Sequence, residues 1–361
     1  MAAPRDNRPT IRDVAHEAGV SHQTVSRVLN DHPKVAPATR TRVLQAIRKL
    51  GYERNLAAQM LTTQRSQIIQ VITVDGKFPF EVPLLDPAHF WPPGRPPART
   101  TPLEGLGYSA LYTECTSENL GRTLEIAAAR MVDGVFLYAP KLHIEDDELL
   151  ALANGIPLVR RDFALESRRI TWVGFDQVRA TQLAVQHLLD LGHRQIAIVT
   201  GTLRAINACW RYETWRKLLL EHGLEPGPAA EGDFTTTKSA VETGYDAMRQ
   251  LFDQGQPFTA VILANDHMAV GALHAIRERG LRVPGDISLV SYDNAPHARF
   301  LDPPLTTVAF DFDLQNRLAF QFLFEQIQQP HTEPHQHVLL PELIVRGSTR
   351  ALPRSGRKSA N

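Results

Sequence analysis

The chain has 361 residues, of which 43% are hydrophobic and 22% charged; this is typical of globular proteins with two or three domains and excludes collagen-like, disordered and disulfide-stapled miniprotein classes. Its net charge is zero, but residues 1–65 hold eleven Lys and Arg against five Asp and Glu, an excess that suits a polyanionic partner, with a solvated basic surface as the alternative. No apolar run approaches the roughly 18 residues of a membrane span, and the polar N-terminus lacks the apolar core of a secretion signal, so we expect a cytoplasmic protein.

The N-terminal segment predicts three short helices. Thr10 can cap the first helix and Gly19 ends it, and after the turn Ser21 can cap the second. Pro37 then opens a third helix that Gly51 stops. The inward apolar residues are Ile11, Val14, Ala15, Ala18, Val25, Val28, Leu29, Val43, Ile47 and Leu50. Two helices joined by a glycine turn predict a helix-turn-helix, although three such helices alone are more often a plain bundle.

The polar side of the second helix carries groups suited to DNA. Arg27 can bind guanine O6 and N7, Gln23 can pair with adenine N6 and N7, and His22 can reach a base edge or a phosphate. Hydroxyls that could bind phosphate oxygens belong to Ser21, Thr24 and Ser26. We therefore predict that this helix enters the major groove.

A longer motif now becomes recognisable. The run TIRDVAHEAGVSHQTVSRVLN, from Thr10 to Asn30, resembles the DNA-binding head of the lactose/galactose-repressor (LacI/GalR) family, T-I-x-D-V-A-x-x-A-G-V-S-x-x-T-V-S-R-V-L-N, and fills every fixed position. The resemblance adds Thr10 and Asn30 to the expected DNA-binding residues. Ala36 departs from the family, which usually has a Ser there to cap the third helix.

The next segment, GYERNLAAQML from Gly51 to Leu61, is similar to the family's hinge, G-Y-x-x-N-x-x-A-x-x-L. A helix this short is marginal alone, so we expect it to order on DNA. The resemblance implies DNA contacts from Asn55, Ala58 and Leu61, with Leu61 wedged between base pairs in the minor groove. Gln59 stands where many relatives have Arg, and a flexible linker is the alternative.

From Gln67 onward, apolar strand-like runs alternate with helical patterns. The predicted strands are 68–74, 134–138, 196–200, 260–264 and 287–292. This alternation predicts parallel α/β sheets, divided into two lobes because of the length. The pattern alone fits a dehydrogenase, a solute-binding protein or a sensor domain.

The family resemblance continues through this segment, for example in VGFD (173–176), ANDHMAVG (264–271) and VPGDISLV (283–290). It implies a periplasmic-binding-protein-like pair of lobes with an effector in the cleft. The residues it places at the effector are Asp75, Phe80, Arg211, Phe234, Asn265 and Asp293. Arg and Asp suit a hydroxyl-rich ligand and an aromatic face suits a sugar ring. As alternatives, Arg211 forms a surface ion pair, Phe234 is core and Asp293 is a turn residue.

One region departs strongly from the family. Residues 79–102 contain eight prolines, where relatives have a long helix that lines the cleft and joins the dimer interface. Each interior proline costs a helix about 3 kcal/mol, so no helix is expected here. The segment is either a genuine proline-rich loop or a local reading-frame disruption that is restored downstream; we favour the disruption.

Neither catalysis nor metal binding is expected. Asp176 is interpreted as a helix cap, and the His331, His335 and His337 group as incidental solvated histidines in a loop. Cys115 and Cys209 lack a CxxC partner and are expected to be buried small hydrophobes. We expect no catalytic residue, no metal and no cofactor.

The combined prediction is an all-α helix-turn-helix head plus an α/β periplasmic-binding-protein-like two-lobe effector domain with parallel sheets. Its parts are a DNA-binding domain at 1–54, a hinge helix and linker at 55–66, an effector-binding and dimerisation domain at 67–349, and a disordered tail at 350–361. Within the large domain, the N-lobe is expected at about 67–168 and 309–330, and the C-lobe at about 169–308 and 335–349.

The expected function is that of a sequence-specific transcriptional regulator, a repressor. It would bind a palindromic double-stranded DNA operator as a homodimer and be controlled allosterically by a small sugar-like effector, away from any membrane. The alternative is a sugar- or solute-binding sensor protein without a DNA function. An enzyme would need paired carboxylates, or a nucleophile with its base, and the matched positions supply recognition groups instead.

Overall fold

A computed structural model describes residues 9–29, 32–52, 65–75, 108–161, 167–232 and 238–353. The chain divides into two compact units, 1–66 and 67–361, and each is described by itself. The predicted hinge residues Asn55, Ala58 and Leu61, and the proline-rich segment 79–102, lie outside the described residues.

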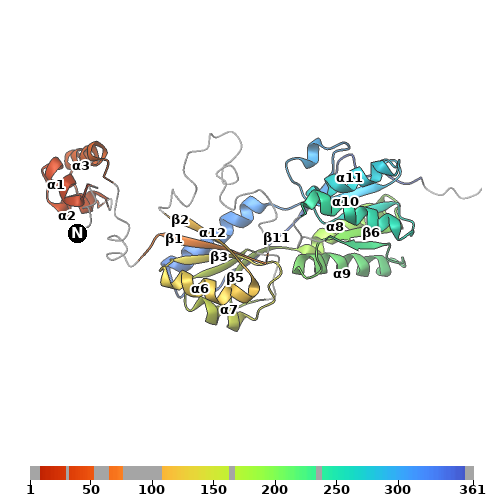
Figure 1. Cartoon of the computed structure of the whole chain (residues 1–361), viewed down its shortest axis with the longest axis horizontal. Coiled ribbons are helices and arrows are strands. Elements are labelled where there is room, and N and C mark those ends of the chain that lie inside the picture. The colour runs from red at the N-terminus through yellow and green to blue at the C-terminus, as the bar shows by residue number, and fades with distance from the viewer. Residues whose placement is uncertain are drawn as a thin grey trace, which may run out of the picture. The chain divides into compact units, whose positions relative to one another are not determined.

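The first unit contains the three predicted helices, α1 (Ile11–Ala18), α2 (His22–Leu29) and α3 (Pro37–Leu50) (Figure 1). Thr10 and Asp13 form a capping box at the start of α1, and the backbone N–H of Thr24 donates to Ser21 Oγ at 3.2 Å at the start of α2. Gly19, at φ 62°, and Gly51, at φ 60°, end α1 and α3 in the left-handed conformation that favours glycine. The helix-turn-helix prediction is confirmed.

Apolar side chains from all three helices meet in the small core of the first unit. Val14, Val25 and Val43, one from each helix, are fully buried. Ala36 precedes α3 without any side-chain hydrogen bond to the helix, as its departure from the family's Ser predicted. The core therefore fixes how α2 is held against α1 and α3 and leaves its polar side exposed.

The second unit begins with a parallel six-stranded sheet in the order β11-β5-β4-β3-β1-β2. Its strands are β1 (Ile68–Val74), β2 (Ser109–Cys115), β3 (Gly134–Tyr138), β4 (Leu158–Arg161), β5 (Thr171–Phe175) and β11 (Gln336–Leu339). The helices packed on it are α6 (Leu120–Ala129) and α7 (Asp146–Ala153) against one face, and α12 (Phe312–Gln328) against the other. Helices on both faces explain why these strands are apolar almost throughout.

A second six-stranded sheet follows, in the order β12-β10-β9-β8-β6-β7, with only β12 antiparallel. Its strands are β6 (Ile196–Thr200), β7 (Ala229–Glu231), β8 (Ala260–Leu263), β9 (Ser288–Asp293), β10 (Thr306–Ala309) and β12 (Glu342–Ile344). The helices α8 (Gln177–Asp190) and α9 (Ile206–Glu221) pack on one face, and α10 (Ala240–Asp253) and α11 (Asp266–Glu278) on the other. The predicted two-lobe architecture of parallel α/β sheets is confirmed.

The chain passes between the sheets at points that differ from the prediction. β5 and β11 both belong to the first sheet, where they pair with each other. Two of the three crossings therefore fall after Phe175 and after Leu339, later in the chain than the expected boundaries at about 168 and 335. The third lies between β10, which ends at Ala309, and α12, which begins at Phe312. Strand pairing between segments more than 150 residues apart decides these boundaries, and no local pattern reports it.

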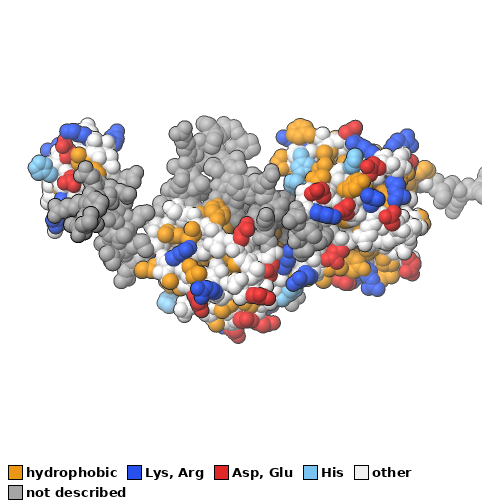
Figure 2. Space-filling model, viewed as in Figure 1, with side chains coloured by type: hydrophobic (Ala, Val, Ile, Leu, Met, Phe, Trp, Pro, Cys, Tyr) orange, Lys and Arg blue, Asp and Glu red, His pale blue; other side chains and the backbone are white. Residues whose placement is uncertain are grey.

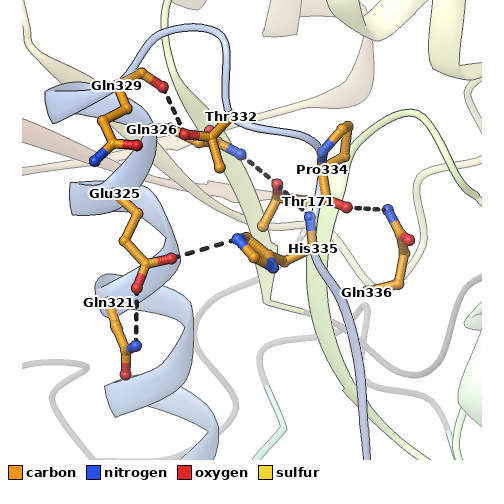
Figure 3. A network of polar contacts seen from close by, with 9 residues as sticks. All are labelled: Thr171, Gln321, Glu325, Gln326, Gln329, Thr332, Pro334, His335 and Gln336. Carbon is orange, nitrogen blue, oxygen red and sulfur yellow. Dashed lines mark hydrogen bonds and ion pairs between the residues drawn. The ribbon is translucent and has the colours of Figure 1, made fainter.

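The loop before β11 is held in place by specific contacts. The ring of His335 stacks on Phe322 of α12 with centroids 4.5 Å apart, and His335 Nε2 lies 3.3 Å from Glu325 Oε2. Its backbone N–H donates to Thr171 Oγ1 of β5, so the loop joins α12 to β5 (Figure 3). The side chain of His335 is 40% exposed, but the interpretation of this histidine as incidental was wrong, because its backbone N–H bonds Thr171, which is 164 residues away in the sequence.

Two smaller expectations also need correction. The backbone N–H of Leu352 donates to Leu191 O at 2.8 Å, and Arg350 O contacts His193 Nε2 at 3.1 Å, so the chain remains packed through its first residues after Thr349. The disordered-tail prediction is wrong for 350–353, and 354–361 lie outside the described residues. Cys209 is exposed rather than buried. Within the described ranges, no helix is both long and apolar enough to cross a membrane.

Candidate DNA-binding surface and effector site

The polar face of α2 is presented to solvent as the sequence predicts. His22, Gln23 and Arg27 are exposed, whereas Val25 and Val28 are buried. Ser21 is exposed, and its hydroxyl lies 3.0 Å from that of Thr24, which is half-buried like Ser26. A short helix with one buried and one polar exposed side can enter the major groove with its exposed side chains toward the bases.

Thr10 and Asn30 were also predicted to bind DNA. Thr10 is exposed, but its hydroxyl donates to Asp13 Oδ2 at 2.7 Å. Hydrogen bonds from the backbone N–H of Thr10 and then from its hydroxyl lower the pKa of Asp13. The side chain of Thr10 therefore caps α1, and any contact of Thr10 with DNA would be made in addition to this cap. Asn30 lies outside the described residues.

Charge on the head is not confined to the polar face of α2. Lys and Arg side chains are visible at several places on the head in Figure 2, and Arg42, Arg48 and Lys49 of α3 are exposed. A distributed positive surface attracts the phosphate backbone without reading sequence. Base reading is therefore expected from α2, and general affinity from the whole head.

In the second unit, Arg211 is the centre of the predicted effector site. Its side chain comes from α9, is only 6% exposed and donates from Nε to Gln177 Oε1 at 2.7 Å. It also donates from Nη1 to Ala264 O, just after β8, at 2.8 Å. Three elements therefore hold one buried guanidinium, which rules out the surface ion pair considered from the sequence.

Aromatic rings lie against the guanidinium groups of Arg211 and Arg161. Arg211 Cζ lies 3.9 Å from the centre of the Tyr292 ring and 5.4 Å from that of Phe310. On the first sheet, Arg161 Cζ lies 5.3 Å from the Tyr138 ring centre and 5.4 Å from that of Phe312. The Phe310 and Phe312 rings are 6.0 Å apart, so cations and aromatics form one continuous row across both sheets.

Asp293 stands at the carboxyl end of β9 with its backbone at φ 100°, a left-handed value that is unusual for a residue with a side chain. Its Oδ2 is buried and makes no hydrogen bond to the described residues. Burial raises the pKa of Asp293 to about 7, while the nearby Arg211 charge opposes the rise. A strained, incompletely bonded carboxyl group beside Arg211 is the arrangement expected of a ligand-binding residue.

The raised pKa of Asp293 predicts a specific pH dependence. Between its ordinary value of 3.8 and about 7, the folded protein keeps a proton that the unfolded chain has released, so stability falls as pH rises through this window. Asp293→Asn keeps the group neutral and should not show this loss. We expect the variant to gain in melting temperature relative to the wild-type protein from pH 4 to pH 7 and then level off. A difference independent of pH would contradict the assignment.

Asn265, which was predicted at the effector, and its neighbour Asp266 both have structural roles. Asn265 Oδ1 accepts from the backbone N–H of Met268 at 2.8 Å and caps α11, so its amide nitrogen is the part that can serve a ligand. Asp266 accepts from Thr307 Oγ1 at 2.9 Å and from the backbone N–H of Ala295 at 2.7 Å. Asp266 therefore ties the segment after β9 to β10.

Asp75 directly follows β1 of the first sheet. Its Oδ1 accepts from the backbone N–H of Ser117 at 3.0 Å, and its carbonyl accepts from Lys141 Nζ at 2.9 Å. These contacts all lie within the first lobe, and none of them joins Asp75 to Arg211 or Asp293. Phe80 and Phe234 lie outside the described residues.

The structure adds residues that sequence reasoning missed. Gln177 and Arg161 face the site from the start of α8 and the end of β4, and Tyr138, Phe310 and Phe312 supply rings. One signal was available for Arg161, because LVRR places charge inside an otherwise buried strand, which needs a reason. No local sequence pattern indicated that Gln177 would face the site. Among the described residues, no group of three or more His, Cys, Asp or Glu could hold a metal ion.

The carboxyl ends of the strands assemble these groups. Three of the strands end in a residue of the site: β3 in Tyr138, β4 in Arg161 and β9 in Asp293. In parallel α/β sheets, side chains at the carboxyl ends of strands meet at one edge and form the usual ligand site. Contacts also join the two lobes here, since the backbone N–H of Ile206 donates to Pro140 O at 3.1 Å. A polar small molecule could therefore bind at this edge, where its contacts would depend on how the two lobes are arranged.

Comparisons with known proteins cover both units of the chain. Residues 10–55 match the family described as bacterial regulatory proteins, lacI family, and residues 185–349 match the periplasmic binding protein-like domain. The chain is 33% identical to the transcriptional repressor PurR of Pasteurella multocida, over 95% of this chain and 99% of that protein. It is 32% identical to the repressor CytR of Escherichia coli K12, over 98% and 99%.

A solved structure shows the same likeness. The lac repressor dimer bound to operator and the anti-inducer ONPF superposes with a TM-score of 0.80 at 31% identity, covering 96% of this chain and 100% of that one. A complex of the regulator CelR with cellobiose gives a TM-score of 0.63 at 30% identity, over 94% and 100%. The likeness therefore extends over both units.

Proposed function

Because this chain belongs to the LacI family of bacterial regulatory proteins, we propose that it is a transcriptional repressor that binds a near-palindromic operator as a homodimer and responds to a small sugar-like effector. The observation that carries this proposal is the exposed polar face of α2, with Gln23 and Arg27, on a complete helix-turn-helix head. Two copies related by a two-fold axis would read two half-sites. Such a regulator would act in the cytoplasm, where the DNA is.

The effector role rests on the row of groups around Arg211. Buried guanidinium and carboxyl groups hydrogen-bond hydroxyls in a fixed geometry, and aromatic rings cover the apolar face of a sugar ring. No general base or nucleophile is needed for this role, and we assign no catalytic activity. Binding would change the arrangement of the two lobes and so the DNA affinity, by typically 1 to 3 kcal/mol in allosteric proteins.

Replacing Arg27 with alanine tests the base-reading role. A bidentate arginine contact to guanine is worth about 1 to 3 kcal/mol of discrimination. Arg27→Ala should therefore weaken operator binding by that amount and relax base preference at one position of each half-site. A selection from random duplexes followed by a gel-shift titration over a salt series measures both effects. Wild-type affinity should fall steeply with salt because phosphate contacts release counterions.

Arg48→Ala is the matched control, because Arg48 is also an exposed arginine of the head but lies on α3. It should lower affinity for all duplexes alike without changing base preference. Binding that is equal on every duplex, with and without Arg27, would refute base reading. A protein that binds sugars yet selects no duplex would instead be a solute sensor. A thermal-shift screen of sugars, sugar phosphates and nucleosides identifies the effector class.

A further inference from the structure

A buried amide group lies against Arg211 at the effector site. Gln177, the first residue of α8, is fully buried, and its Oε1 accepts from Arg211 Nε at 2.7 Å. Because an arginine side chain donates hydrogen bonds but cannot accept them, this bond fixes which end of the amide faces Arg211. The amide nitrogen of Gln177 is therefore directed away from the guanidinium. This buried Nε2 has no hydrogen-bond partner among the described residues.

The structure describes two other buried glutamines, and both use their amide nitrogen. Gln70 donates from Nε2 to Thr113 Oγ1 at 3.0 Å, and Gln315 donates from Nε2 to Val173 O at 2.9 Å. A buried donor that lacks an acceptor is destabilising, and native proteins seldom keep one without a reason. The exception at Gln177 therefore indicates an acceptor that the described residues do not supply.

The surrounding contacts hold Gln177 in this position. The hydroxyl of Tyr292 donates to Thr181 Oγ1 at 3.3 Å, and Thr181 donates to the backbone carbonyl of Gln177 at 3.0 Å. The ring of Tyr292 also lies over the guanidinium of Arg211, which bonds the side chain of Gln177. The backbone and the side chain of Gln177 are thus held by the same group of residues, so its amide nitrogen keeps one direction.

Asp293, beside Arg211, contains a second atom of this kind. Its Oδ2 is buried and makes no hydrogen bond to the described residues. Nε2 of Gln177 can only donate, whereas the carboxyl group of Asp293 accepts when it is charged and can also donate when it is neutral. A hydroxyl both donates and accepts. One hydroxyl, or two on neighbouring carbon atoms, can therefore bond both residues.

We propose that Gln177 is a specificity-determining residue of the effector site: its amide oxygen positions Arg211, and its amide nitrogen donates to a hydroxyl oxygen of the effector. This inference rests on the proposed effector role and adds to it a residue and the kind of group that this residue recognises. An effector without a hydroxyl at this place would leave the amide nitrogen of Gln177 buried and unbonded.

Gln177→Glu separates the two roles, because glutamate keeps an oxygen for Arg211 Nε but loses the N–H donor. In the full chain without ligand, this change should raise the melting temperature by about 2 °C or more, since it removes the unbonded donor and gives a buried guanidinium a charged partner. The same change should weaken the binding of hydroxyl-bearing probes about tenfold, which corresponds to one lost hydrogen bond. The probes are D-glucose, D-ribose, cellobiose and adenosine, each titrated by calorimetry.

Gln186→Glu is the matched control, because Gln186 lies on the same helix but is exposed. The same exchange at this position should leave the probe affinity within about twofold of the wild-type value. It should change the melting temperature by less than about 1 °C.

Higher stability together with weaker probe binding in Gln177→Glu would support the proposal, because a residue kept only for packing would not gain one while losing the other. Unchanged probe affinity in this variant, or a wild-type protein that binds none of the four probes, would overturn the recognition role. Lower stability, or failure of the variant to fold, would overturn it as well, because the amide nitrogen would then already be satisfied.

A crystal structure of the wild-type protein with a bound probe tests the same contact without any variant. A probe oxygen should lie within about 3.2 Å of Gln177 Nε2, and a carbon atom in that place would contradict the proposal. The proposed function is tested separately, since operator selection by the wild-type protein is measured without any effector. Loss of that selection would overturn the proposed function, and none of the results with Gln177→Glu bears on it.

Discussion

Replacing Arg211 with methionine is expected to lower effector affinity about 100-fold or more. Methionine keeps much of the length of the side chain but removes every donor, so the ligand loses charge-assisted hydrogen bonds worth about 1.5 to 3 kcal/mol each. It also leaves Gln177 Oε1 and Ala264 O without the donors that Arg211 supplies at 2.7 and 2.8 Å. Calorimetric titration of the effector found by the ligand screen measures the loss.

Arg216→Met provides the control for this prediction. Arg216 lies on the same helix, α9, but is exposed, so its replacement should change effector affinity by less than about twofold. Operator binding without effector should persist in both variants, because α2 lies in the other compact unit. Unchanged effector affinity in Arg211→Met would show that this guanidinium is structural only.

Gly271→Ala should be the most destabilising single-methyl substitution of the effector domain. A Cβ at Gly271 of α11 would lie 1.9 Å from Val241 O and 2.7 Å from Tyr245 N. Both are backbone atoms of α10, so no side chain can rotate away. The approach is reciprocal, because a Cβ at Gly244 of α10 would lie 2.1 Å from Met268 O. We expect a loss of about 3 kcal/mol or more, at the upper end of overpacking effects, because the helices must separate.

Urea unfolding of the full chain, followed by circular dichroism, measures this loss as an earlier transition of the effector domain. His274→Ala is the control, since His274 is an exposed residue of the same helix and its replacement should change stability by less than about 0.5 kcal/mol. A Gly271→Ala midpoint equal to that of the control would show that α10 and α11 do not approach so closely.

Much of the fold was readable from local patterns. The strands predicted at 68–74, 134–138 and 196–200 coincide with β1, β3 and β6. The strand predicted at 260–264 is one residue longer than β8, and the one predicted at 287–292 is shifted by one residue from β9. These strands are buried on both faces, so they appear as short apolar runs between turn residues. β5 and β11 were not placed correctly, because their pairing joins distant parts of the chain.

The site was only partly readable. Arg211 and Asp293 were predicted from motifs, and the structure brings them together with Tyr292. Asn265 was predicted to bind the effector, yet its Oδ1 caps α11. Arg161 was missed, because its importance depends on Tyr138 and Phe312, which are neighbours in space and not in sequence.

By itself, the order of amino acids determined the helix-turn-helix head, its polar face and the alternation of strands and helices. These features depend on caps, glycine turns and hydrophobic spacing, which act over a few residues. The folded chain alone decided where the lobes exchange strands and which charges meet at the ends of the strands. Those outcomes depend on contacts between residues far apart in sequence, and burial then changes the chemistry of the groups involved, as it raises the pKa of Asp293.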